Sequence, residues 1–195
     1  MTYRSLRDFI AGLESAGELV RVREPVSTVL EMTEIQTRLI AQGGPAVLFE
    51  KPVKADGTPS DIPVLVNLFG TVKRVAMGVT MGGVARSDAK SLREVGEVLA
   101  TLRQPEPPRS FGAAMDLLPL AKTVMAMRPK TVSAPACQQV VLRGQDIELS
   151  KLPVQTCWPG DPAPLISWPL IGTKGPGDAR EDSFNLGIYR LQVLY

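Results

Sequence analysis

The spacing of apolar residues changes along this chain. In the first two thirds, apolar side chains recur every three or four residues, as at Leu92, Val95 and Leu99, which is the spacing of an amphipathic helix. From Gln138 onward, β-branched residues come in short runs separated by prolines and turn residues, which is typical of strands. We therefore predict an α+β protein in which a helix-containing part precedes a strand-rich part.

Two helices are predicted in the first 45 residues. The first begins at Ser5, a suitable N-terminal cap, and stops at Gly17. The second is capped by Ser27 or Thr28 and ends at Gly43-Gly44. Short strands accompany them, at residues 18–23, where Pro25 is expected to close the strand, and at residues 46–49 and 64–66. The first 70 residues thus read as a mixed α/β arrangement.

The prolines at positions 105, 107 and 108 form the best candidate boundary between domains. We predict a mixed α/β subdomain over residues 1–108, a helical connection over 109–130 with a kink at Pro119, and a strand-rich region over 131–195. Within the last region, strands are predicted at residues 139–142, 152–154, 165–168 and 170–173. Residues 165–174 and 184–195 are expected to pair as a hairpin with a long loop.

Composition excludes several functional classes. Lysine and arginine exceed aspartate and glutamate by only 22 to 20, and these charges are scattered, so nucleic acid is not an expected partner. No segment resembles a signal peptide or reaches the roughly 18 apolar residues of a membrane span, which favours a cytoplasmic protein. With no histidine and only Cys137 and Cys157, a closed zinc site is not expected, and both cysteines are predicted to be reduced thiols.

Four other residues each have two possible roles. Trp158 and Trp168 could line an aromatic substrate pocket, but tryptophan in a strand-rich segment is more often buried in the core. Lys73 and Arg74 could lie near an anionic group or a membrane surface, but a solvated pair is the default. We therefore expect two core tryptophans and two exposed cations.

The run from Asn185 to Arg190 is the clearest candidate site. On a regular strand these two residues face opposite ways, so either a bulge at Gly187 turns the strand or a shared ligand wraps around it. Five residues separate them by about 16 Å, the length of a mononucleotide. The Asn185 amide suits a divalent cation that already carries phosphate oxygens, and Arg190 suits a carboxylate. An ordinary strand with a solvated arginine remains the alternative.

The terminal run Asn185-Leu186-Gly187-Ile188-Tyr189-Arg190 is one of several separated stretches that together resemble the UbiD family of decarboxylases. The others, in the order of the family, are residues 6–9, 17–19, 34–35, 43–46, 67–71, 73–78, 92–96, 105–108, 136–139 and 156–159. They span nearly the whole chain.

The resemblance implies a homo-oligomeric enzyme that removes CO₂ from an aromatic or α,β-unsaturated acid with prenylated FMN, Mn²⁺ and K⁺. It implies that the strand-rich region is the start of a split β-barrel like that of flavin reductases, here incomplete. Within the family, the similarity points to 3-polyprenyl-4-hydroxybenzoate as substrate, in ubiquinone biosynthesis. A flavin prenyltransferase would supply the cofactor, and a peripheral contact with the inner membrane would be compatible with this substrate.

By the same resemblance, Asn185 matches the metal ligand that holds the cofactor phosphate. Ile188, Tyr189 and Arg190 match the tripeptide that contacts the cofactor, and Arg190 also matches the arginine that engages the substrate carboxylate. The family's other metal ligands and its proton-handling acids have no counterpart here. We therefore expect this chain to be the N-terminal part of such a decarboxylase, inactive by itself. The alternatives are a non-catalytic fragment for flavin-phosphate binding or assembly, and a flavin reductase, which the matches outside the barrel disfavour.

Overall fold

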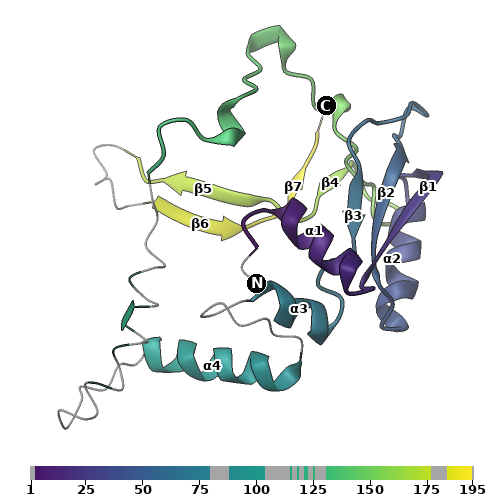
Figure 1. Ribbon diagram of the computed structural model, residues 1–195. Coiled ribbons are helices and arrows are strands. Elements are labelled where there is room, and N and C mark those ends of the chain that lie inside the picture. Colours follow the sequence, from purple (N-terminus) through teal and green to yellow (C-terminus); the bar gives the residue numbers. More distant parts are fainter. Residues whose placement is uncertain are drawn as a thin grey trace. The chain divides into compact units, whose positions relative to one another are not determined.

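The computed structural model (Figure 1) describes residues 3–79, 88–103, 131–176 and 184–194, together with positions 115, 118, 121, 122 and 125. The chain forms two compact units, one of residues 1–18 and 69–148 and the other of residues 19–68 and 149–195. Each unit therefore combines segments that are far apart in the sequence. The predicted division into three parts stays a prediction, since the proline cluster and most of residues 109–130 lie outside the described residues.

In the first unit the described residues include the helices α1 (Leu6–Ser15), α3 (Val72–Gly78) and α4 (Ala89–Arg103). The predicted first helix is confirmed: the Ser5 hydroxyl accepts a hydrogen bond from the Asp8 backbone N–H at 3.2 Å, and Gly17 adopts a left-handed φ of 69°. Helix α4 confirms the periodicity from Leu92 onward. Helix α3 was not predicted, although Thr71 caps it by accepting from the Arg74 backbone N–H.

Three charged side chains meet in this unit, and the prediction of a solvated Lys73–Arg74 pair is wrong for Arg74, while Lys73 is exposed as predicted. The Lys73 ammonium lies 2.6 Å from one Glu18 carboxylate oxygen, and the Arg74 guanidinium lies 3.2 Å from the other. The Arg74 side chain is fully buried, whereas Lys73 is half-exposed. Hydrogen bonding from Lys73, aided by Arg74 and opposed by burial, lowers the pKa of the Glu18 carboxyl below its usual value.

The predicted strand at residues 139–142 is not formed. This part of the unit carries two 3₁₀ turns, Ala136–Gln138 and Gly144–Asp146, and Val140 is 76% exposed. The β-branched run has no neighbouring strand among the described residues. Strand propensity alone does not form a strand, because a strand needs a hydrogen-bonded neighbour.

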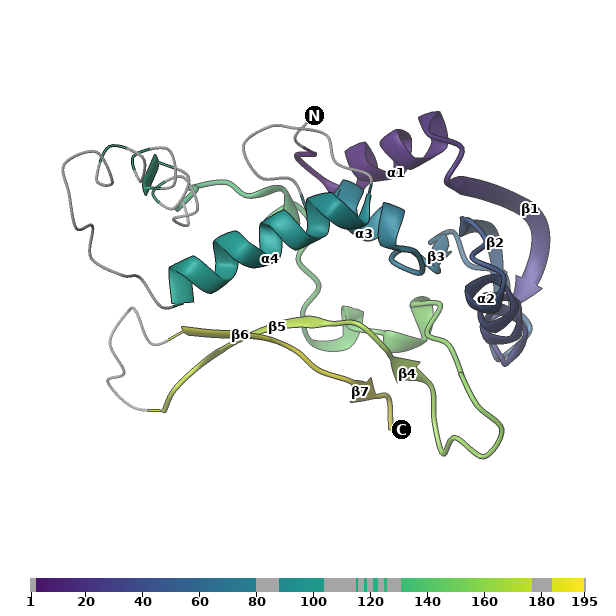
Figure 2. The same ribbon diagram turned by 90° about the horizontal axis from the view of Figure 1, so that it is seen from below.

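The second unit is built around a three-stranded sheet of order β1-β2-β3. Strand β1 (Leu19–Ser27) pairs in parallel with β2 (Ala46–Val53), which pairs antiparallel with β3 (Val64–Val66). Helix α2 (Glu31–Ala41) makes the crossover from β1 to β2 and lies against the sheet (Figures 1 and 2). The core between them consists of Val26, Met32, Val47, Phe49 and Val66. The second predicted helix and the strands at residues 46–49 and 64–66 are therefore confirmed.

Pro25 does not close β1 as predicted. The strand continues to Ser27 after a shift of one residue in its register between Val22 and Pro25, which marks a β-bulge. Strand β1 also stands at the edge of the described sheet. Because an edge strand has a neighbour on one side only, a proline there need not remove a hydrogen bond from the ladder.

The start of α2 also differs from the prediction, because neither Ser27 nor Thr28 caps it. The N-cap is Leu30, with φ 64° and ψ −39° and no side-chain cap bond. The Glu31 N–H donates to the Val29 carbonyl at 2.7 Å, so Leu30 is the centre of a γ-turn, a strained conformation for a residue with a Cβ. The Ser27 N–H instead donates to the Glu31 carboxylate at 2.7 Å.

A bridge to the last third of the chain holds this turn in place. The Leu30 N–H donates to the Thr156 carbonyl at 2.9 Å, and the Thr156 N–H donates to the Thr28 carbonyl at 3.1 Å. Val29 and Thr156 thereby form an isolated parallel bridge, and Gln155 forms an antiparallel bridge with Leu165. The predicted strand at residues 152–154 is not formed, and the two single bridges lie just after it, at Gln155 and Thr156.

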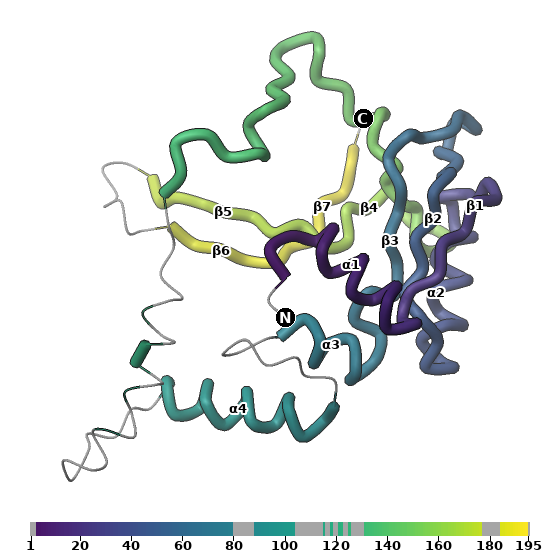
Figure 3. The backbone as a smooth tube through the Cα atoms, viewed as in Figure 1, coloured from purple at the N-terminus to yellow at the C-terminus, as the bar shows by residue number. Residues whose placement is uncertain are grey.

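The described residues of the second unit also form the short strands β4 (Leu165–Ile166), β5 (Leu170–Lys174), β6 (Phe184–Ile188) and β7 (Leu191–Gln192). Strand β5 pairs antiparallel with β6, and β4 with β7; Figure 3 traces the opposite courses of β5 and β6. The predicted hairpin is confirmed. Both cysteines are free thiols, Cys137 exposed and Cys157 half-buried. Within the described part of the chain, every helix is too short or too polar to cross a membrane.

Replacing Glu18 by glutamine should lower the free energy of unfolding at pH 7 by about 2 kcal/mol, because the substitution removes charge-assisted hydrogen bonds to Lys73 and to buried Arg74. Since the folded pKa of Glu18 is depressed, its contribution is present above the unfolded value near 4.5 and is lost as the pH falls through the folded pKa. Urea denaturation at pH 7 and pH 3.5 should therefore show a smaller acid loss in Glu18→Gln than in the parent chain.

The matched control is Glu24→Gln, an exposed carboxylate on β1. Its urea curves should follow those of the parent at both pH values. If Glu18→Gln and the parent lost the same stability on acidification, the salt bridge would not be the source of the pH dependence.

Candidate functional site

The predicted site residues lie where the β5–β6 ladder passes into the β4–β7 pair. Leu170 pairs with Ile188 in the first ladder, and Ile166 pairs with Leu191 in the second. Three residues, Ser167 to Pro169, therefore oppose only two, Tyr189 and Arg190. The Tyr189 N–H donates to the Pro169 carbonyl at 3.3 Å across this step. The irregularity interrupts strand alternation between Asn185 and Arg190.

A bulge at Gly187 was one of the two predicted ways to bring Asn185 and Arg190 together. The predicted position of this bulge is wrong. Gly187 pairs regularly with Ile171, and the irregular step comes two residues later, with the extra residue on the opposite strand. Asn185 and Gly187 therefore share one face of β6, while Leu186 and Ile188 share the other.

Asn185 and Tyr189 are brought together over Gly187. The Asn185 amide nitrogen lies 3.4 Å from the Tyr189 hydroxyl, a long hydrogen bond. A Cβ on Gly187 would lie 2.5 Å from the Tyr189 ring, so the ring covers this glycine closely and no larger residue fits without moving it. With the amide nitrogen turned to Tyr189, the amide oxygen of Asn185 is left available as a ligand.

Thr173 adds a hydroxyl to this face, and sequence analysis missed it. It pairs directly with Asn185 across the ladder, and directly opposed residues have Cβ atoms about 5 Å apart. Alternation along residues 170–174 identifies Thr173 only once the register of the hairpin is known, because a shift of one residue would put it on the other face.

Ile188 lies on the opposite, apolar face. Its neighbours there are Leu170, Leu186 and Phe184, all more than half exposed. The Lys174 ammonium sits 5.5 Å from the centre of the Phe184 ring. The hairpin thus has one face carrying Asn185, Thr173 and Tyr189 and another that is hydrophobic.

Arg190 is exposed and lies in the two-residue step between β6 and β7. Within the described ranges, its guanidinium makes no ion pair or side-chain hydrogen bond. A guanidinium without a competing partner keeps all five N–H donors for a ligand, and their fork geometry matches a carboxylate.

The described residues supply only part of the ligand set that a metal ion would need. Nowhere among them do three His, Cys, Asp or Glu side chains gather closely enough to hold an ion. Asn185 offers one neutral oxygen and Thr173 a neighbouring hydroxyl, whereas cations such as Mn²⁺ take several oxygen ligands. A metal ion at Asn185 would therefore need further ligands from outside these residues.

The expectation that both tryptophans belong to the core is wrong. Trp158 is 58% exposed and Trp168 is 63% exposed. Trp168 stands in the segment that opposes Tyr189 and Arg190, and it lines a cavity. Sequence analysis favoured the core because most tryptophans are largely buried.

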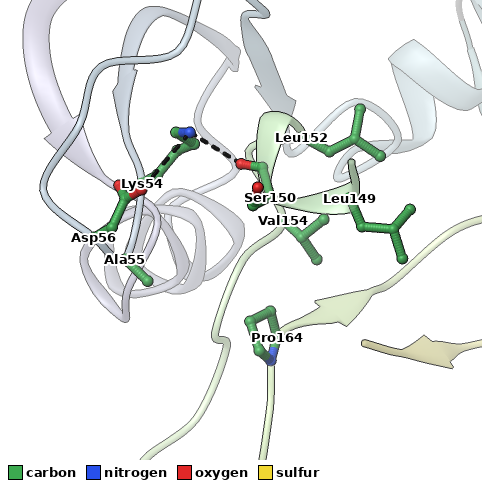
Figure 4. Close-up of a pocket in the computed structure, with 8 residues that line it drawn as sticks. All are labelled: Lys54, Ala55, Asp56, Leu149, Ser150, Leu152, Val154 and Pro164. Carbon is green, nitrogen blue, oxygen red and sulfur yellow. Dashed lines mark hydrogen bonds and ion pairs between the residues drawn. The ribbon is translucent and has the colours of Figure 1, made fainter. Parts of the chain in front are cut away.

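A second, smaller cavity of about 130 Å³ lies between the β2–β3 turn and the 3₁₀ turn Leu149–Lys151 (Figure 4). The Lys54 ammonium donates to the Ser150 carbonyl at 2.9 Å and lies 3.9 Å from the Asp56 carboxylate. Hydrogen bonds from Thr58 lower the pKa of Asp56, and Lys54 adds to the effect. Because the two charges cancel, this cavity does not attract anions, and the lysine serves to tie two segments together.

Two family models match the chain. The model described as the 3-octaprenyl-4-hydroxybenzoate carboxy-lyase N-terminal domain (UbiD_N) matches residues 10–99. The model described as the 3-octaprenyl-4-hydroxybenzoate carboxy-lyase Rift-related domain (UbiD) matches residues 130–195. Together they cover most of the chain, including Asn185 and Arg190.

Several solved structures share the fold. The UbiD-class enzyme HmfF from Pelotomaculum thermopropionicum, in an evolved dimeric form in complex with prFMN, matches with a TM-score of 0.60 and 22% identity over 97% of this chain and 36% of its own. Vanillic acid decarboxylase from Sedimentibacter hydroxybenzoicus matches in its open form with a TM-score of 0.70, 23% identity and coverage of 99% and 35%. Its closed form matches with a TM-score of 0.69 and 25% identity over 100% of this chain and 36% of its own. The chain spans about a third of the length of these relatives.

Replacing Gly187 by alanine should displace the Tyr189 ring, because the new methyl group would occupy the position of that ring. The hairpin is exposed and the ring can swing away, so we expect a loss of unfolding free energy below about 1 kcal/mol. NMR should show the change directly, as a shift of the Tyr189 ring protons and the loss of their cross-peaks to residue 187.

Gly172→Ala on the neighbouring strand is the matched control, since nothing lies within 4 Å of a Cβ added there. Its Tyr189 signals should not change. Unchanged Tyr189 signals in Gly187→Ala as well would show that the ring does not rest on Gly187 in solution.

Proposed function

Because the chain belongs to the UbiD family of carboxy-lyases, we propose that it is the N-terminal portion of a decarboxylase that removes CO₂ from an aromatic acid with prenylated FMN. The two family models, which together cover residues 10–99 and 130–195, carry this proposal. Because the chain spans about a third of its solved relatives, catalysis would require the rest of such an enzyme.

In this proposal Asn185 is a ligand of the Mn²⁺ ion that holds the cofactor phosphate. The free amide oxygen of Asn185, with Thr173 beside it on the same face, supports the assignment. Ile188 and Tyr189 contact the cofactor. The Tyr189 ring over Gly187 would hold the Asn185 amide in one orientation, so that its oxygen faces the ion.

Arg190 binds the substrate carboxylate and orients it for cleavage of the C–CO₂ bond. Its exposed guanidinium, which has no competing carboxylate among the described residues, supports this role. Prenylated FMN would supply the electron sink that the cleavage requires. The protein's own contribution from this segment is therefore to bind and orient the acid, while the residue that protonates the product lies outside it.

The finer assignments belong to the same proposal. Among aromatic acids we favour 3-polyprenyl-4-hydroxybenzoate of ubiquinone biosynthesis, because both matching family models carry the name of such an enzyme. We further propose that residues 131–195 begin a split β-barrel, that K⁺ accompanies Mn²⁺, and that the full enzyme is a cytoplasmic homo-oligomer served by a flavin prenyltransferase. One solved structure of the HmfF relative is of an evolved dimeric form in complex with prFMN.

The test is Arg190→Ala, introduced into the gene in its native host. Without the arginine, two charge-assisted hydrogen bonds to the carboxylate are lost, and decarboxylation should slow by about a hundredfold or more. Mass spectrometry of cell extracts should then show the unprocessed aromatic acid accumulating. Arg190→Lys should give an intermediate level, because lysine keeps the charge but not the bidentate grip.

The control is Arg143→Ala, another exposed arginine in the strand-rich region. Extracts of this strain should match the parent. If the Arg190→Ala strain also matched the parent, with no aromatic acid accumulating, Arg190 would not bind the substrate carboxylate.

The alternative is a non-catalytic fragment that binds flavin phosphate or assists assembly. It is supported by the incomplete set of metal ligands among the described residues. With a single amide ligand, the isolated chain should bind FMN and Mn²⁺ weakly and release no CO₂ from 4-hydroxybenzoate when prenylated FMN is added. Titration of FMN, followed by flavin fluorescence, measures this. Tight, Mn²⁺-dependent binding that Asn185→Ala abolishes, still without CO₂ release, would favour the binding role.

A further inference from the structure

Leu30 is held in a backbone conformation that leucine rarely adopts. Its φ is 64° and its ψ is −39°, and the Glu31 N–H closes the turn on the Val29 carbonyl at 2.7 Å. A γ-turn with a positive φ is rare, and it is strained in a residue that carries a Cβ. The N-cap residue of a helix is ordinarily extended and has no such strain. Leu30 therefore has a relaxed alternative to the conformation that the structure shows.

One peptide group links this strain to the last third of the chain. The peptide between Val29 and Leu30 carries the carbonyl that accepts from Glu31 and the N–H that donates to the Thr156 carbonyl at 2.9 Å. Rotating this peptide changes the φ of Leu30 and breaks both hydrogen bonds at once. The turn can therefore relax only when Thr156 releases the Leu30 N–H.

The strain and the hydrogen bonds that oppose its release are of similar size. Two bonds hold Thr156 to the turn, one from the Leu30 N–H and one from the Thr156 N–H to the Thr28 carbonyl at 3.1 Å. In the relaxed state water replaces these partners, so each bond contributes only a small net stabilisation. Strain at one residue in a rarely populated region costs about as much as such a pair contributes. The strained and relaxed states are therefore close in free energy.

Release of Thr156 would leave the core of the second unit intact. The core cluster and the partly buried side chains packed against it all lie between Val22 and Val66. Residues 150–166, which contain Thr156, form a strap whose side chains are all half-buried or exposed. The Lys54 ammonium donates to the carbonyl of Ser150, the first residue of the strap, at 2.9 Å (Figure 4). The strap can therefore separate from the turn while its first residue stays attached.

We propose that the strap and the Leu30 turn form a two-state latch in the folded protein. In the docked state the bridge between Val29 and Thr156 is formed and Leu30 is strained. In the released state the bridge is open and Leu30 takes an ordinary N-cap conformation, while the sheet stays folded. Because the strap continues into β4, which pairs with β7, docking also fixes the strand that follows Arg190. The latch does not rest on the proposed decarboxylase function.

Hydrogen exchange of the whole chain, followed by NMR at urea concentrations below the unfolding transition, tests the latch. The amide protons of Leu30 and Thr156 should exchange through one shared opening, at least about a hundredfold less protected than those of residues 47–49 in β2. Their exchange should hardly respond to urea, since release exposes little surface, whereas exchange in β2 should accelerate. Equal protection or equal urea dependence of the two groups would mean that the bridge opens only on global unfolding, and the latch would be overturned.

Two substitutions at Leu30 separate backbone strain from side-chain contact. Leu30→Gly removes the Cβ and with it the strain, so the protection of the amide protons at positions 30 and 156 should rise by about fivefold. The rise is smaller than full relief of the strain would give, because glycine gains freedom in the released state. Leu30→Ala keeps the Cβ and should not raise the protection. Residues 47–49 should remain the better protected group in both variants, which shows that both fold.

Three results with these proteins would contradict the latch. The first is unequal protection of Leu30 and Thr156 in the parent chain, since one opening must release both. The second is protection at positions 30 and 156 that stays the same or falls in Leu30→Gly. The third is an increase in Leu30→Ala as large as that in Leu30→Gly, which would assign the effect to the side chain rather than to the strained backbone.

Discussion

The second unit depends on the short parallel bridge between Val29 and Thr156. Two hydrogen bonds, from Leu30 to Thr156 and from Thr156 to Thr28, join the β1–α2 turn to a segment more than 120 residues later. Each contributes about 1 kcal/mol, which is comparable to the strain of about 1–3 kcal/mol at a residue held like Leu30. The turn therefore persists because its surroundings fix it.

From this bridge, contacts lead step by step to the candidate site. Gln155, next to Thr156, bridges to Leu165, and Leu165 pairs with Gln192 on β7. Arg190 lies two residues before Gln192. The position of the candidate carboxylate-binding arginine thus depends on a ladder that starts at the strained turn. Placing functional groups on hydrogen-bonded strands limits their movement more than a free loop would.

Sequence analysis succeeded where local chemistry decides the structure. The confirmed features depend on residues close in sequence. They are the cap at Ser5, the helix stop at Gly43 and the hairpin formed by residues 165–174 and 184–192. It failed where a distant partner decides. Arg74 is buried because Glu18 accepts its hydrogen bond, Leu30 replaces Ser27 as the N-cap because Thr156 holds the turn, and residues 139–142 lack the neighbour that a strand requires. At the candidate site, parity placed Asn185 and Ile188 on opposite faces, but Thr173 and the step at Tyr189–Arg190 need the register of the hairpin.

The two-part make-up of the second unit has a consequence for the order of folding during synthesis. The sheet and α2 lie within residues 19–68, so their core can form as soon as this stretch has left the ribosome. Thr156 emerges much later, after about 90 further residues at 5–20 residues per second. For several seconds the turn at Leu30 must therefore exist without its clamp, in a relaxed conformation, and it can become strained only when the last third of the chain docks.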